Sequence, residues 1–183
     1  MAAALNYLLF QIGWLACVWG AARRRVPAGI TVALLVVGWG ALRVAHPGAY
    51  LLFALIVGVL GLAWDSALVA TGLLRYPGAA QSSWRAPAWI FVLWLLFATT
   101  LDSSLAWLQP HMLLALLLGA IGGPLAFVGA ARMGAVQLLR PRAALAALAC
   151  GWAVLLPALS RLALHWFQAQ GTAFVSAHGA SYA

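Results

Sequence analysis

Six stretches of this chain are long enough to cross a membrane and contain almost no charged side chains. They lie at about residues 4–22, 28–46, 50–74, 87–108, 111–133 and 143–168. A membrane-spanning helix needs about 20 mostly apolar residues. Only 7% of the residues are charged, whereas a soluble domain carries roughly 25%. The sequence therefore excludes a water-soluble fold. It predicts an all-α, six-span transmembrane helix bundle over residues 1–168 and a short C-terminal tail at 169–183.

The arginines predict how this bundle is oriented. The chain has ten Lys and Arg residues against two Asp and Glu, and eight of its arginines fall in the first, third and fifth loops. Loops rich in Arg face the cytoplasm, so both termini are expected on the outer, periplasmic side of the cell inner (plasma) membrane. Because the arginines occupy short loops and form no stripe with aromatic residues, no nucleic-acid partner is expected.

Sequence motifs for catalysis and metal binding are missing. The chain has four His and two acidic residues, and it lacks H-E-x-x-H, a nucleophile elbow, a P-loop and a dinucleotide-binding glycine motif. Cys17 and Cys150 lie inside apolar segments, where a thiol usually behaves as a small hydrophobe. We therefore expect no cofactor and no metal, and we assign no catalytic residue.

Asp65 is an ionisable residue that lies well inside the third apolar segment, where such groups are costly. Helical spacing places it on one face with Gly58, Gly61 and Gly72, which predicts that it faces a packing seam. Such a carboxylate is either a proton or cation site, the acid of an intramembrane enzyme, or a structural hydrogen-bonding group.

From the helical rise per residue, Gln11 and Thr99 are predicted to lie at a depth in the membrane similar to that of Asp65. The three residues are therefore expected to form a polar layer near the middle of the membrane. In the structural interpretation, Asp65 is hydrogen-bonded to Gln11, Thr99 or Trp64 and holds helices together.

A second polar layer is expected nearer the outer face, with Asn6, Arg43, Asp102 and Arg161 contributed by four different spans. Two guanidinium groups against one carboxylate leave a positive charge, which suits a phosphate or carboxylate head group. The alternative is a structural ion pair between Asp102 and one arginine, with the other arginine reaching to water.

Small and aromatic residues predict how the helices pack. Gly119 and Gly123 permit a close helix contact, and exposed glycine seams of this kind permit a homo-oligomer. Pro124 and Pro157 are expected to kink their helices. Aromatic residues near the expected span ends predict an interfacial belt. These residues are Tyr50, Tyr76, Trp84, Trp89, Trp107 and Trp166.

Four segments resemble a known family. They are NYLLFQIGWLACVWG at 6–20, DSALVATGLL at 65–74, WLLFATTLDSSLAW at 94–107 and GAIGGPLAFVGAARMG at 119–134. They are similar to the bacterial domain-of-unknown-function family 2878. The resemblance implies a small multi-pass inner-membrane protein with no established activity. It also implies genes near those of lipid methyltransferases of the cyclopropane-fatty-acyl type, and so a lipid-modifying enzyme as a partner.

We therefore expect a lipid-handling or lipid-modification accessory protein, with membrane lipids as partners. It would hold an acyl chain between helices and a head group near Arg43, Asp102 and Arg161. The alternative is a small secondary transporter or channel that uses Asp65 as a proton or cation site. A third interpretation, an intramembrane enzyme using Asp65 with Gln11 or Thr99, has no recognised motif in its favour.

Overall fold

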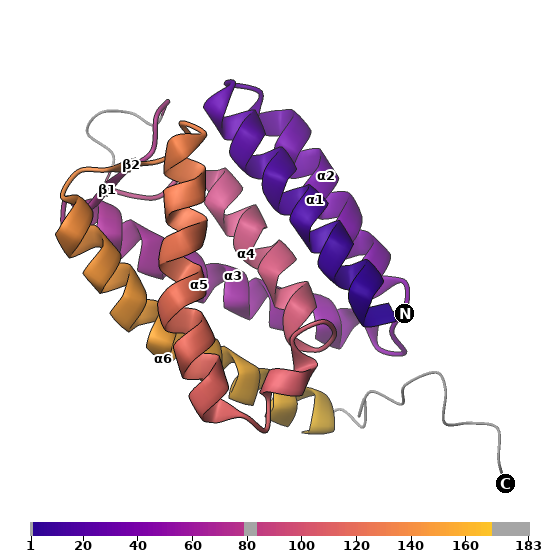
Figure 1. The fold of residues 1–183 in the computed structure, drawn as a ribbon. Helices are drawn as coiled ribbons and strands as arrows, with labels where there is room; N and C mark the ends of the chain where they lie inside the picture. The colour runs from indigo at the N-terminus through magenta and orange to yellow at the C-terminus, as the bar shows by residue number, and fades with distance from the viewer. Residues whose placement is uncertain (1, 79–83, 170–183) are drawn as a thin grey trace, which may run out of the picture.

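The computed structural model describes residues 2–78 and 84–169, so most of the expected tail at 169–183 lies outside the described residues. Within these ranges the chain forms an all-α bundle, as predicted (Figure 1). The helices are α1 (Ala2–Ala22), α2 (Val26–Ala41), α3 (Pro47–Ala70), α4 (Ala88–Leu101), α5 (Met112–Arg132) and α6 (Pro141–Ala169). Two short strands, β1 (Leu74–Arg75) and β2 (Gln137–Leu138), and a 3-10 turn, η1 (Ala106–Leu108), complete the described part.

Four of these helices, α1, α3, α5 and α6, are long and apolar enough to cross a membrane. The other two are shorter, with 16 residues in α2 and 14 in α4. The segment expected as one span at 87–108 is divided, because α4 stops at Leu101. The hydroxyls of Thr99 and Thr100 there donate to carbonyls one turn earlier, and the Gln109 amide donates to the Leu101 carbonyl at 2.9 Å.

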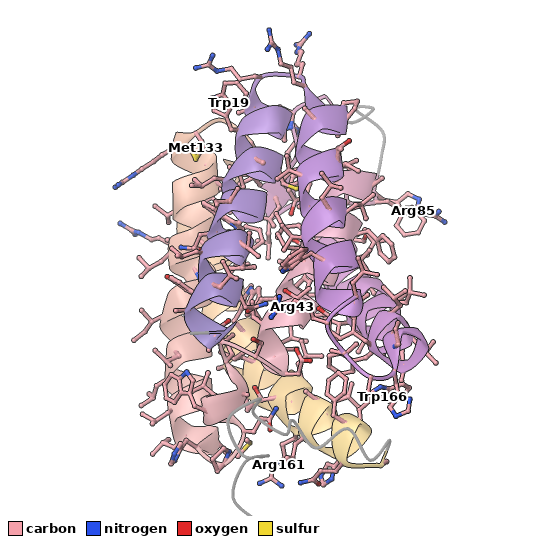
Figure 2. All side chains as sticks on the ribbon, turned by 90° about the vertical axis from the view of Figure 1, so that its right-hand side faces the viewer. Trp19, Arg43, Arg85, Met133, Arg161 and Trp166 are labelled. Atoms are coloured by element: carbon pink, nitrogen blue, oxygen red, sulfur yellow. The ribbon has the colours of Figure 1, made fainter. Side chains whose placement is uncertain are left out.

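Helices α1, α3 and α5 end in the same way. In each, the second residue after the helix has a positive φ, of 57° at Arg24, 68° at Gly72 and 87° at Gly134. The following N–H then donates to a carbonyl in the last helical turn, as in a Schellman motif. Figure 2 shows Trp19, near the end of α1, and Met133, directly after α5, at the same upper end of the molecule.

We call this the basic end, because all eight arginines of the first, third and fifth connections are exposed there. They are Arg23, Arg24, Arg25, Arg75, Arg85, Arg132, Arg140 and Arg142. The strands join two of these connections, with Leu74 opposite Leu138 and the Leu139 N–H donating to the Leu73 carbonyl at 3.0 Å. The sequence pattern predicts ordinary loops for both segments. The two paired strands, which we call the β1–β2 ribbon, instead connect the end of α3 to the end of α5.

Helix α4 is the centre of the bundle. Most of its residues are buried, and it packs against α1, α2, α3 and α6. A helix that is apolar on all sides is expected in such a position. Around it, α1 packs mainly on α2 and α5 mainly on α6, so that two helix pairs flank α4 (Figure 1).

The α1–α2 pair depends on Gly29. A Cβ atom there would lie 2.6 Å from the carbonyl oxygen of Ala16 and 2.7 Å from the Cα of Cys17, and both neighbours are backbone atoms. Gly38 is on the same helix, yet a Cβ atom there would have no neighbour within 4 Å.

We expect Gly29→Ala to force α1 and α2 apart and to lower the free energy of unfolding by about 1–3 kcal/mol, the usual cost of overpacking. The matched change Gly38→Ala should leave that free energy within about 1 kcal/mol, because alanine favours helix and fits. Thermal unfolding of both variants in detergent measures the difference. Equal unfolding midpoints would contradict the proposed packing.

Candidate functional site

The carboxylate of Asp65 is buried at the interface of α3 and α4, where 1% of the residue is exposed. The Tyr76 hydroxyl donates to one of its oxygens at 2.6 Å, and the Trp94 indole N–H donates to the other at 2.7 Å. Tyr76 comes from the segment after β1 and Trp94 from α4. One side chain of α3 therefore holds both neighbouring elements in place.

Trp94 continues this arrangement into a wall of stacked rings. Its ring lies parallel to that of Trp152 on α6, with centroids 4.9 Å apart and planes 10° apart. Phe97 meets both rings edge-on, at 5.6 Å from Trp94 and 5.3 Å from Trp152. Stacked and edge-to-face geometries are the favourable ones for aromatic pairs. The wall therefore joins α4 to α6.

Glycines allow these large rings to fit. A Cβ atom at Gly61 would collide with the Trp94 indole, and one at Gly123 would collide with the Trp152 indole. Of the predicted seam, Gly58 and Gly61 pack against α4, whereas Gly72 lies beyond the end of α3 and a Cβ atom there would meet nothing within 4 Å. The predicted close contact of α5 is made with α6. Gly122 differs from these positions, because a Cβ atom there would meet nothing within 4 Å.

Gly122 faces open space because a cavity of about 230 Å³ lies between the two helix pairs. Its walls come from α1, α4, α5 and α6, and Asp65, Tyr76 and Val136 lie at its basic end. The residues that line it are Phe10, Trp14, Val18, Asp65, Tyr76, Trp89, Ile90, Leu93, Trp94, Phe97, Leu118, Gly119, Gly122, Gly123, Ala126, Phe127, Ala130, Val136, Trp152 and Leu156.

The cavity is open at one end and closed at the other. Along α5, Leu118 is 44% exposed, Gly122 is exposed and Ala126 is half-buried, while Ala130 is only 8% exposed. Along α1, Phe10 and Trp14 are half-buried and Val18 is 1% exposed. We call the open part, between Phe10 on α1 and Leu118 on α5, the mouth. The cavity therefore narrows toward the basic end.

The expected layer of Asp65, Gln11 and Thr99 is not joined by hydrogen bonds among these residues in the described structure. Gln11 donates to the Tyr7 hydroxyl at 3.3 Å, and Thr99 accepts from the Asn6 amide. The partners of Asp65 are Tyr76 and Trp94 instead of Gln11, Thr99 or Trp64. These two partners cannot be predicted from the sequence pattern, because spacing along one helix carries no information on which loop folds back onto it.

The second expected layer is brought together only in part. Asn6 donates to the Thr99 carbonyl at 3.0 Å and accepts from the Ser104 hydroxyl at 2.7 Å, so it lies beside the turn that contains Asp102. The guanidinium of exposed Arg43 lies over the Trp39 ring at 5.3 Å.

Arg161 is exposed on α6, and Figure 2 shows it near the lower tip of the molecule, with Arg43 well above it. One oxygen of Asp102 is buried without a hydrogen-bond partner in the described residues. Asp65 is thus the one residue of the two expected layers that lines the cavity within the described part of the chain.

Only some residues of the predicted interfacial aromatic belt are exposed. Trp84 and Trp107 are more than half exposed, whereas Tyr50, Tyr76 and Trp89 are at most 5% exposed and belong to the core. The sequence pattern predicts no particular role for Trp14 and Trp152, which line the cavity. Their position inside apolar segments, away from the ends where tryptophan is enriched, was the available signal.

The remaining polar groups of the described residues include several buried side chains without a partner. Across residues 2–78 and 84–169, no three His, Cys, Asp or Glu side chains lie close enough to hold a metal ion. The indole N–H groups of Trp64 and Trp152 and the Ser160 hydroxyl are buried without a hydrogen-bond partner in the same residues.

Comparison with known proteins identifies the family. Residues 3–158 match the family described as "Protein of unknown function (DUF2878)", so the chain belongs to it. No curated protein and no solved structure matches the chain. Because the family has no described activity, it assigns no chemistry to the cavity or to Asp65.

Replacing Asp65 separates the need for its hydrogen bonds from the need for its charge. Asp65→Leu leaves two buried donors unpaired, and we expect the free energy of unfolding to fall by about 2–6 kcal/mol. In Asp65→Asn the amide oxygen can accept from Trp94 and the amide N–H can donate to the Tyr76 oxygen, so the loss should be less than half as large. Thermal unfolding in detergent compares the two. Equal losses would show that the charge itself is required.

Proposed function

We propose that this protein is a lipid-handling or lipid-modification accessory protein that holds one apolar chain of a membrane lipid in the cavity between its helix pairs. The observation that carries this proposal is the cavity itself, which is apolar, aromatic and open between α1 and α5. The helix surfaces beside the mouth are also apolar, with exposed Leu8, Ile12, Ile121 and Leu125. Lipid chains that surround these helices would meet the mouth directly.

The cavity is unfavourable when it is empty, and this favours a lipid chain as its occupant. Side chains that face a void lose dispersion contacts on that side. An apolar cavity of about 150 Å³ in a soluble protein stays dry and takes up apolar molecules, and this cavity is larger, at about 230 Å³. A lipid chain restores the missing contacts without breaking any hydrogen bond of Asp65.

For the topology we propose six crossings of the inner membrane with both termini outside. The exposed arginines at the basic end support a cytoplasmic position for that end. Helices α2 and α4 span only roughly 24 Å and 21 Å at their lengths of 16 and 14 residues. The turn and η1 after α4 extend that crossing, and irregular backbone at membrane depth is tolerated where protein buries it.

Alkaline phosphatase fused to the C-terminus should be active, since that reporter folds outside the cytoplasm. The same reporter inserted after Arg140, in the connection between β2 and α6, should be inactive. Enzyme activity per amount of fusion protein in whole cells measures both. The reverse pattern would place the basic end outside and overturn the topology.

The rival function is a small transporter or channel with Asp65 as its proton or cation site. One observation favours it, namely that Asp65 lines the cavity. Both of its oxygens nevertheless accept hydrogen bonds from neutral donors, which suits a structural group equally. In this case Asp65→Asn should abolish pH-dependent uptake while it leaves lipid binding unchanged.

Filling the cavity should exclude the lipid chain. Gly122→Leu adds a side chain toward open space, and we expect it to lower photolabelling of the purified protein by a diazirine-bearing palmityl probe at least fivefold. The control Gly38→Leu adds the same side chain to the exposed face of α2, where a Cβ atom also meets nothing. It should label as the unmodified protein does.

Mass spectrometry of the labelled peptides provides the second readout. Labels should concentrate on residues 10–18 of α1 and 118–130 of α5. Uniform labelling of all lipid-facing helices, or equal labelling of the two variants, would remove the proposed function.

A further inference from the structure

Two polar side chains of α1, Tyr7 and Gln11, lie beside the mouth of the cavity. Tyr7, Gln11, Trp14 and Val18 follow a four-three-four spacing, which places them in one stripe along the helix. Trp14 and Val18 line the cavity. The stripe therefore changes from the lining residues Trp14 and Val18 to polar side chains at the level of the mouth, where Phe10 also lines the cavity.

Gln11 lies deep in the membrane for an amide that is not fully buried. It is nine residues after the start of α1, or roughly 14 Å along the helix, which is close to half of a hydrocarbon core about 30 Å thick. Gln11 is half-buried and Tyr7 is 50% exposed. Polar groups exposed to hydrocarbon are unfavourable unless they form hydrogen bonds. Gln11 and Tyr7 lie beside the mouth, and we therefore expect them to have a hydrogen-bond partner there.

The pair satisfies itself only in part. The Gln11 amide donates to the Tyr7 hydroxyl at 3.3 Å. This bond uses one amide N–H and one lone pair. The Tyr7 O–H, the second amide N–H and the Gln11 carbonyl oxygen remain able to bond a ligand. They offer donors and an acceptor, but no charge.

From this geometry we propose that Tyr7 and Gln11 bind the hydroxyl group of an uncharged single-chain lipid, a long-chain alcohol, whose chain enters the cavity. This inference rests on the proposed function and names its ligand. A hydroxyl both donates and accepts, as the pair does, whereas a carboxylate or phosphate head group that only accepts would leave the Gln11 carbonyl oxygen without a partner. None of the arginines lines the cavity in the described structure.

The shape of the cavity then sets the direction of the chain. Its closed end lies at Val18 and Ala130, and the 11 residue steps from Gly119 to Ala130 span roughly 16 Å, about half of the hydrocarbon core. With its hydroxyl at Gln11, the alcohol places its chain along Trp14 and its methyl end toward the basic end.

The test uses palmityl alcohol and palmitic acid, each with a diazirine at the terminal carbon, on the full-length protein in detergent. Gln11→Leu and Tyr7→Phe should each lower labelling by the alcohol about threefold to tenfold, the effect of one or two lost hydrogen bonds. Labelling by the acid should be weaker at the outset and change less. Arg161 belongs to the head-group site that the sequence predicts. Arg161→Gln should change labelling by neither the alcohol nor the acid.

Position along the chain gives an independent readout. A diazirine at the terminal carbon of the alcohol should label residues near Val18 and Ala130, and one beside the hydroxyl should label residues near Phe10 and Leu118. The reversed pattern would overturn the inference. So would unchanged alcohol labelling in both Tyr7→Phe and Gln11→Leu, or a loss of acid labelling confined to Arg161→Gln.

These failures differ from failure of the proposed function. If Gly122→Leu blocks both probes while the Tyr7 and Gln11 variants change nothing, the cavity binds a chain but not through this pair. If Gly122→Leu blocks neither probe, the cavity does not bind the chain and both proposals fail.

Discussion

The two hydrogen bonds that the Asp65 carboxylate accepts determine how the walls of the cavity are held. They fix the Tyr76 hydroxyl and the Trp94 indole, which come from the segment after β1 and from α4. Trp94 in turn stacks on Trp152 of α6, and Tyr76 meets Trp89 edge-on at 5.6 Å. A buried carboxylate that accepts two hydrogen bonds can join α3, α4 and the segment after β1 where no water is available to satisfy these polar groups.

Packing of tryptophan against glycine is the second constraint. In a bilayer the lipid tails are as apolar as the side chains, so helices associate through close contact instead of a hydrophobic driving force. The indoles of Trp94, Trp152 and Trp64 each occupy the space that a Cβ atom would take at Gly61, Gly123 and Gly151. Flat, rigid rings fill these hollows, which explains why the chain has ten tryptophans without placing all of them at the membrane surface.

The sequence predicts the features that depend on composition and on spacing within one helix. These include the all-α fold, the apolar segments, the exposed arginines of the odd connections and the glycine face around Asp65. It does not predict contacts between segments distant in the chain. Tyr76 was assigned to an interfacial belt, yet the β1–β2 ribbon and Asp65 hold it in the core.

The grouping of Asn6, Arg43, Asp102 and Arg161 rested on depth alone, and depth does not specify the direction in which a side chain points. The same limit applies to Gln11, whose expected depth was central but whose hydrogen-bond partner proves to be Tyr7 on its own helix.

The cavity follows from how the helices pair. Because α1 packs on α2 and α5 packs on α6, the facing sides of α1 and α5 have few contacts with each other, and α4 lies behind the space between them (Figure 1). Trp14 approaches Gly129 within 3.7 Å of a Cβ position and narrows that space toward the basic end. Nothing comparable narrows it at Gly122. In the proposed function, a lipid chain would pass Gly122 and end at the closed end of the cavity, between Val18 and Ala130. The same glycine face that makes α5 fit against α6 thus also leaves the room that the lipid would occupy.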